Sequence, residues 1–255
     1  MALPRRSLNV RILLVAIVGL AVGLAVWALS GRERQGQLPP LGLFSTLPIY
    51  WGEARDLSGV VDGTAQPHWA RAAIERERRL QPLDLLDADR LQAVPDLLIA
   101  QPRALSPAEN VALDDWVRGG GHVLLFADPM LTAASPFPIG DPRRPQDVTL
   151  LSPILARWGL RLTFDEAQPE GERMVEVAGG PVPVDLAGHF EQVPTAPDAP
   201  AACGLEAGGV LADCRIGRGR ALIVADAALL DGRGEDPDGR TAALSRLMKK
   251  AFSAD

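Results

Sequence analysis

An uncharged apolar segment near the start of the chain constrains its fold more than any other feature. Residues 12–29, ILLVAIVGLAVGLAVWAL, are eighteen consecutive apolar or glycine positions. As a helix, this segment spans about 27 Å, which is close to the ~30 Å hydrocarbon core of a bilayer. The sequence therefore predicts a transmembrane anchor at 12–29 that contacts the lipid bilayer, and a single domain at 41–255.

The charges on either side of the span predict its orientation. Residues 1–11 contain three arginines, whereas the two arginines that follow the span are partly offset by Glu33. Positive charge gathers on the cytoplasmic side of membrane helices, so we expect a single-pass protein of the inner (cytoplasmic) membrane with its N-terminus inside and its main domain in the periplasm. A cleaved signal peptide is the alternative, because Ala28 and Ser30 are small residues at the spacing of a cleavage site, but the apolar run exceeds the usual ~7–15 residues.

Residues 30–40, SGRERQGQLPP, are polar and end in a double proline, which predicts a short linker. Residues 1–30 hold three basic and no acidic side chains. The exported part therefore carries 23 basic and 32 acidic residues, a net charge of −9. Nucleic acid is not expected as a partner of such an acidic domain.

Beyond the linker, apolar runs alternate with amphipathic helical segments. PDLLIAQP, HVLLFADPM and GRALIVADAALL are apolar nearly throughout, as strands buried on both faces must be. The alternation predicts an α/β domain with a flavodoxin-like, mostly parallel sheet and helices on both faces. Residues 171–217 instead alternate with period two between turn residues, and this pattern predicts a β-hairpin insert.

The segment LSPAENVALDDWVRGGG shows how one of these helices begins and ends. Ser106 as N-cap, Pro107 at the first helical position and Glu109 two residues later predict a capping box. Gly119 stands where a left-handed residue would follow the helix. Phosphate loops lie after a strand and before a helix, whereas the glycines of RGGGH, residues 118–122, have the reverse order and are expected to cap the helix.

Familiar catalytic and metal-binding motifs do not occur in the sequence. His68, His122 and His189 lie far apart, and there is no HExxH, CxxC or G-x-S-x-G pattern. We therefore expect neither a metal nor another cofactor.

Two stretches, LSPAENVALDDWVRGGGHVLLFADP and GRGRALIVADAALLD, resemble the GldG-like periplasmic domains of uncharacterised ABC-type transport systems. These domains share the class I glutamine amidotransferase-like fold. The resemblance implies a membrane-tethered accessory domain, used for binding or scaffolding, whose partners are the membrane and ATPase subunits of the transporter. Catalytic amidotransferases carry a cysteine on a strand-to-helix elbow, whereas Cys203 and Cys214 fall in the predicted insert, so the resemblance implies no glutaminase activity.

Ligands of open α/β sheets bind outside the carboxyl ends of the strands. Three segments are expected at that edge, and they supply the candidate binding residues Tyr50, Trp51, Glu53, Asp128, Pro129, Met130 and Asp226. Two alternatives compete with a binding site. The aromatic pair would pack under the next loop while the aspartates cap backbone N–H groups, or the acidic residues would serve a periplasmic hydrolase that acts on envelope material.

The two cysteines flank a glycine pair in CGLEAGGVLADC. A two-residue turn at Gly208 and Gly209 would place Cys203 opposite Cys214, at the ~5.5 Å Cα separation of a hydrogen-bonded pair. A disulfide tolerates this separation, and exported proteins can oxidise their thiols. The alternative is two half-buried thiols that behave as small hydrophobes.

Overall fold

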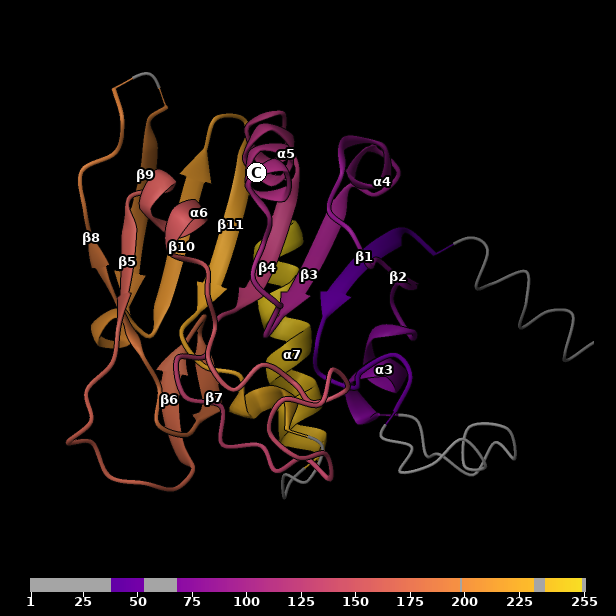
Figure 1. Cartoon of the computed structure of the whole chain (residues 1–255), viewed down its shortest axis with the longest axis vertical. Helices are drawn as coiled ribbons and strands as arrows, with labels where there is room; N and C mark the ends of the chain where they lie inside the picture. The colour runs from indigo at the N-terminus through magenta and orange to yellow at the C-terminus, as the bar shows by residue number, and fades with distance from the viewer. Residues whose placement is uncertain (1–37, 53–67, 198, 232–236, 254–255) are drawn as a thin grey trace, which may run out of the picture. The chain divides into compact units, whose positions relative to one another are not determined.

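The computed structural model describes residues 38–52, 68–197, 199–231 and 237–253 (Figure 1). The predicted anchor at 12–29 and all but the last residues of the linker lie outside these ranges, as does Glu53. None of the helices described combines the length and the apolarity that a membrane crossing needs. Pro40–Asp255 form a unit with its own core.

The central sheet has seven strands in the order β2-β1-β3-β4-β11-β10-β9. The first five run parallel to one another, and β10 and β9 extend the sheet in antiparallel fashion. The mostly parallel α/β sheet predicted from the apolar runs is therefore confirmed. The strands are β1 Pro40–Ser45, β2 Arg79–Pro82, β3 Asp96–Ala100, β4 His122–Phe126, β9 Ala201–Glu206, β10 Leu211–Ile216 and β11 Gly219–Val224.

Helices cover both faces of this sheet, which explains why its strands are apolar on both sides. Successive strand residues point to opposite faces, so β3 places Leu98 in one core and Leu97 and Ile99 in the other. Figure 1 shows α5 in front of the sheet and α7 behind it. The first core is closed by α3 Trp69–Ile74 and α7 Pro237–Phe252, the second by α4 Ala88–Gln92, α5 Pro107–Arg118 and α6 Ser152–Arg157.

Helix α5 begins as its sequence predicts and ends one residue later than expected. Ser106 Oγ accepts the Glu109 N–H at 3.2 Å, and Glu109 Oε2 accepts the Ser106 N–H at 2.9 Å, which completes the capping box. Gly119 has a right-handed φ of −71° and still donates its N–H to Asp115 O, so the positive φ, 119°, falls on Gly120.

Residues 171–217 contain more than the single hairpin expected. β6 Arg173–Val177 and β7 Gly180–Val184 form one hairpin, and β8 His189–Gln192 pairs with β5 Leu160–Thr163. β9 and β10 form a second hairpin around the 3₁₀ turn Ala207–Gly209, and β10 pairs with β11 of the main sheet. A short 3₁₀ turn, Ala228–Leu230, follows β11. Period-two alternation indicates strands but does not specify which strand each one pairs with.

Candidate functional site

The loops that follow β4 and β11 bring two predicted site residues to equivalent positions on adjacent strands. Phe126 pairs with Val224 in the parallel register, and Asp128 and Asp226 each lie two residues beyond that pair. Both side chains are buried, with 1% of their surface exposed. The expectation that these aspartates share the carboxyl edge of the sheet agrees with this geometry.

Each carboxylate accepts two backbone N–H groups. Asp128 Oδ1 accepts from Met130 at 2.8 Å, and its Oδ2 accepts from Ala227 at 3.0 Å. Asp128 therefore joins the loop after its own strand to the loop after β11.

Asp226 makes the corresponding bonds on the other side. Its Oδ1 accepts from Ala228 at 2.6 Å and its Oδ2 from Asp185 at 2.9 Å. All four carboxylate oxygens thus cap backbone donors, as the capping interpretation of these residues predicts.

The same burial perturbs the titration of both groups. Desolvation raises the pKa of Asp128 to about 6, although its two N–H donors oppose the change. Desolvation also raises the pKa of Asp226 well above its usual value, and repulsion from the nearby Asp128 carboxylate adds to this effect. Two interacting buried carboxyl groups therefore lie at one edge of the sheet.

Gln101, which follows β3, belongs to this cluster but was not anticipated. Its side chain is fully buried, and its Nε2 donates to Asp128 O at 3.1 Å and to Gln146 O at 2.8 Å. Its Oε1 accepts the Asp128 N–H at 2.9 Å. The backbone of Gln101 has a φ of 42°, which a non-glycine residue rarely adopts. A polar residue directly after an apolar strand was the available signal, but the left-handed backbone has no sequence signature.

Tyr50 packs with α3, and the Trp51 ring packs on Tyr50. The Arg71 guanidinium lies 4.2 Å from the centre of the Tyr50 ring and donates to Tyr50 O at 2.5 Å. The Tyr50 and Trp51 rings meet edge to face at 4.8 Å, and 76% of Trp51 is exposed. Trp51 is thus largely exposed, and the loop under which it was expected to pack lies outside the described residues. Of the remaining predicted residues, Pro129 is half-buried and Met130 is exposed.

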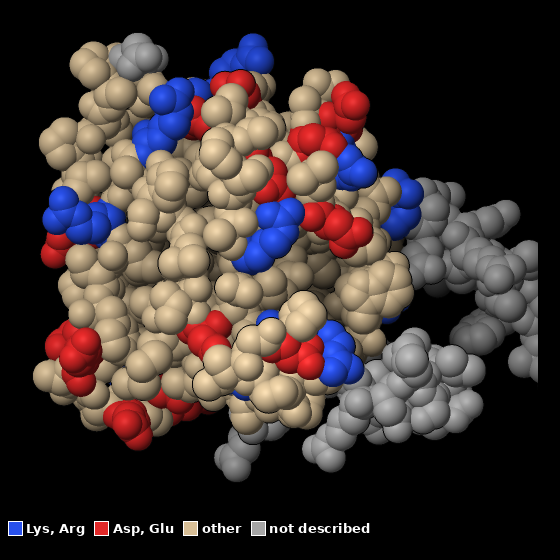
Figure 2. Space-filling view, in the orientation of Figure 1, with Lys and Arg blue, Asp and Glu red and all other residues tan. Residues whose placement is uncertain are grey.

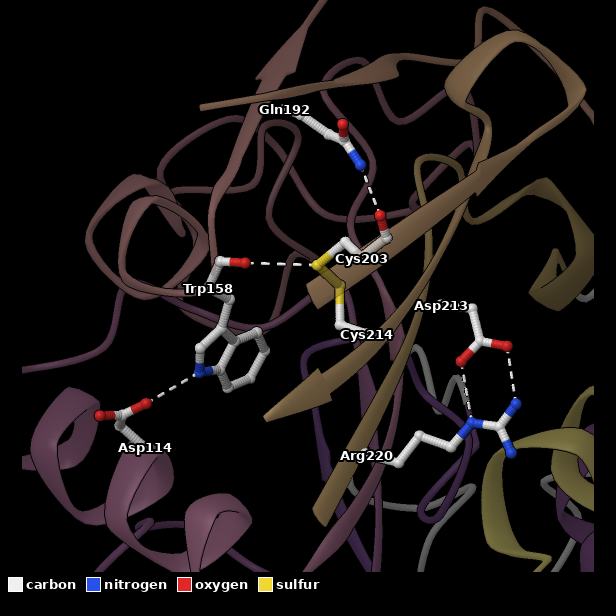
Figure 3. Close-up of a disulfide and its surroundings, with 7 residues drawn as sticks. All are labelled: Asp114, Trp158, Gln192, Cys203, Asp213, Cys214 and Arg220. Atoms are coloured by element: carbon white, nitrogen blue, oxygen red, sulfur yellow. Dashed lines mark hydrogen bonds and ion pairs between the residues drawn. A yellow bond between two sulfur atoms is a disulfide. The ribbon is translucent and has the colours of Figure 1, made fainter. Parts of the chain in front are cut away.

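A disulfide joins Cys203 and Cys214, which pair across β9 and β10 in the register predicted (Figure 3). Their Cα atoms lie 4.0 Å apart, closer than the expected separation and nearer to that of a non-hydrogen-bonded pair. Cys203 Sγ lies 3.3 Å from Trp158 O; a disulfide sulfur carries no proton, so this is a packing contact. The Trp158 indole N–H donates to buried Asp114 at 3.0 Å.

The described residues contain no group of three or more His, Cys, Asp or Glu side chains that could hold a metal ion. On the face shown in Figure 2, acidic and basic side chains are interspersed over the surface. This face therefore shows no basic stripe of the kind that nucleic-acid recognition uses.

The family model described as "ABC-type uncharacterized transport system" matches residues 68–187, from the N-cap of α3 to just beyond β7. This segment is similar to that family. The resemblance expected from the sequence is thereby confirmed, and the family points to an auxiliary protein of an ABC-type transport system. No curated protein matches the chain.

Several solved structures are similar at low identity. A GH42 β-galactosidase from G. stearothermophilus is 14% identical, with 84% of this chain covered and a TM-score of 0.48. A putative ThuA-like protein from Bacteroides uniformis is 10% identical, covers 86% of this chain and 94% of its own length, and has a TM-score of 0.45. A cytoplasmic protein from Salmonella typhimurium is 11% identical, with a TM-score of 0.44, and the match covers 83% of this chain and 98% of that protein. The chain spans only 30% of the β-galactosidase, and none of these likenesses bears on activity.

Proposed function

We propose that this chain is a membrane-anchored periplasmic accessory domain of an ABC-type transport system that acts by binding or scaffolding rather than by catalysis. The family match over residues 68–187 carries the proposal. The predicted anchor at 12–29 would tether the domain beside the membrane and ATPase subunits.

The chemistry of the described residues supports a non-catalytic role. Both cysteines of the chain are held in the disulfide, so neither supplies the thiolate that amide hydrolysis of the amidotransferase type requires. The oxygens of Asp128 and Asp226 are buried and engaged with backbone donors. These aspartates hold the loops at the carboxyl edge in place.

Those loops expose several large apolar side chains. Among the described residues after β1 and β4, five large apolar side chains are exposed: Trp51 (76%), Met130 (45%), Ile139 (87%), Val148 (47%) and Leu150 (57%). Apolar side chains on loops fixed by a rigid sheet are suited to contacts with another protein. We assign the contact with the transporter subunits to this edge.

Co-purification tests the proposal and the assigned edge together. The full-length chain, extracted in mild detergent and analysed by mass spectrometry, should bring down an integral membrane subunit and an ATPase subunit. Trp51→Ser should reduce their recovery, whereas Val111→Ser, which removes an exposed apolar side chain from α5, should not. Recovery of neither subunit would contradict the proposed function, and equal recovery with both variants would contradict only the assigned edge.

The location is tested separately by a reporter fused after residue 255. A reporter that is active only outside the cytoplasm should show activity, because the arginines of residues 1–11 favour a cytoplasmic N-terminus. Reporter activity in the cytoplasm would reject the periplasmic location.

One observation favours the hydrolase alternative: the two interacting carboxyl groups have raised pKa values, as acid and base catalysts often do. This alternative predicts turnover of envelope material by the purified chain that is lost in Asp128→Asn and Asp226→Asn. Absence of such turnover leaves the accessory role as the proposed function.

A further inference from the structure

A cavity of about 490 Å³ lies between α4 and α5, at the amino ends of β3 and β4. Its walls include Gln92, Pro95, Asp115, Trp116, His122 and the glycine turn 119–121. The volume is within the ~300–1,000 Å³ range of small-molecule sites. The cavity lies at the opposite edge of the sheet from the aspartate cluster and the exposed apolar loops.

One wall is an indole ring held in place by a glycine. A Cβ atom added to Gly121 would lie 2.4 to 2.5 Å from three ring atoms of Trp116, which is far inside a van der Waals contact. The ring therefore packs directly on the Gly121 backbone, and any side chain at this position would displace it. The last glycine of RGGGH thus positions an aromatic wall of the cavity.

The glycine turn is not a site for an anion, because its donors are already used. Gly119, Gly120 and Gly121 donate their N–H groups to carbonyls of α5 at 2.9 to 3.0 Å, and His122 donates to Pro95 O at 3.3 Å. The carboxyl end of a helix carries a partial negative charge. The backbone around the cavity therefore favours a positive ligand.

The polar side chains have the same preference. Asp115 supplies an exposed carboxylate. His122 Nδ1 lies 3.1 Å from Asp96 Oδ1, while Arg78 pairs with the other oxygen of this buried carboxylate at 2.5 Å. Because a carboxylate oxygen only accepts, His122 Nδ1 carries the proton in this contact.

We propose that this cavity binds an alkylammonium cation, that is, a positively charged nitrogen that carries small alkyl groups. The Trp116 ring attracts such a cation through its π-face, and Asp115 and the end of α5 add negative charge. Gln92, Pro95 and the indole surround its alkyl groups. The site does not depend on the proposed role in transport.

Calorimetric titration of the full-length chain in detergent tests the site with two probes of the same shape. Choline carries a quaternary ammonium group, and 3,3-dimethyl-1-butanol is its neutral carbon analogue. Choline should bind saturably at one site per chain, and the neutral analogue should bind about tenfold more weakly or not at all.

Three variants locate the binding. Trp116→Leu should weaken choline binding about tenfold, and Asp115→Asn, a change on the surface of α5 that leaves the core intact, should weaken it about threefold. Trp51→Leu, at the other edge of the sheet, should bind choline as the unmodified chain does. Equal affinity for the two probes, no saturable choline binding, or undiminished binding by Asp115→Asn and Trp116→Leu would each overturn the proposal.

Discussion

Replacing Asp128 by asparagine should change how the stability of the domain depends on pH. Burial raises the pKa of Asp128 from 3.8 to about 6, and only 1% of the residue is exposed. Between about pH 4 and pH 6 the folded state keeps a proton that the unfolded chain has released, so this site makes the fold less stable as the pH rises. Across this range the free energy of unfolding falls by about 3 kcal/mol, and above about pH 6 the contribution of Asp128 no longer changes with pH.

Asparagine does not ionise, so the variant should not show this loss. Asp128 accepts from two donors, the N–H groups of Met130 and Ala227. The asparagine side chain has one oxygen to accept from one of them, and its NH₂ group faces the other. That mismatch costs about 1–3 kcal/mol at every pH. The difference in unfolding free energy between Asp128→Asn and the wild type should therefore move by about 3 kcal/mol in favour of the variant between about pH 4 and pH 7.

Urea unfolding, followed by tryptophan fluorescence at both pH values, measures this difference. Met130→Leu is the matched control, because it keeps the N–H group that Asp128 accepts and adds no titratable side chain. Its difference from the wild type should be the same at both pH values. If the wild type and Asp128→Asn showed parallel pH profiles, the reasoning about a buried, proton-holding carboxyl group would be refuted.

Three further outcomes are expected. Reduction of the disulfide, which joins residues 11 positions apart, should lower the free energy of unfolding by about 3 kcal/mol, and two free thiols in denatured, unreduced protein would contradict the bridge. Glu109→Gln should lower the free energy of unfolding by about 2 kcal/mol near neutral pH, because the Arg103 ion pair and backbone N–H groups lower the pKa of Glu109 to about 2. In urea unfolding, this deficit should shrink as the pH falls from about 4.5 toward 2. A deficit that stays constant over this range would contradict the prediction. Purified residues 38–255 should release no ammonia from glutamine, and turnover that survives Cys203→Ala and Cys214→Ala would reveal a nucleophile of another kind.

Local features of this fold could be predicted from the sequence because each depends on residues close together in the chain. The capping box of α5 needs only Ser106 and Glu109, and the register of Cys203 with Cys214 follows from the glycine pair between them. The shared edge of Asp128 and Asp226 was also predictable, because two parallel strands end at the same edge of a sheet.

Features that depend on distant partners were not predictable in this way. Alternation within 171–217 indicated strands, but β8 pairs with β5 and β10 pairs with β11, choices that only the tertiary structure makes. Gln101 adopts its left-handed backbone because its side chain bonds to Asp128 and Gln146, and neither partner is near it in sequence. The cavity beside Trp116 likewise needs α4 and α5 together.

The order of the strands also determines when the sheet can be completed as the chain emerges. β4 lies inside the sheet, yet its register pairs His122 with Arg220, about a hundred residues later. A chain that leaves the ribosome or translocon N-terminus first can pair β1, β2, β3 and β4, but one edge of β4 stays open until 219–224 arrive. A truncation before residue 219 would leave an apolar interior strand with an open edge, so its product should aggregate or engage chaperones instead of forming a smaller stable domain.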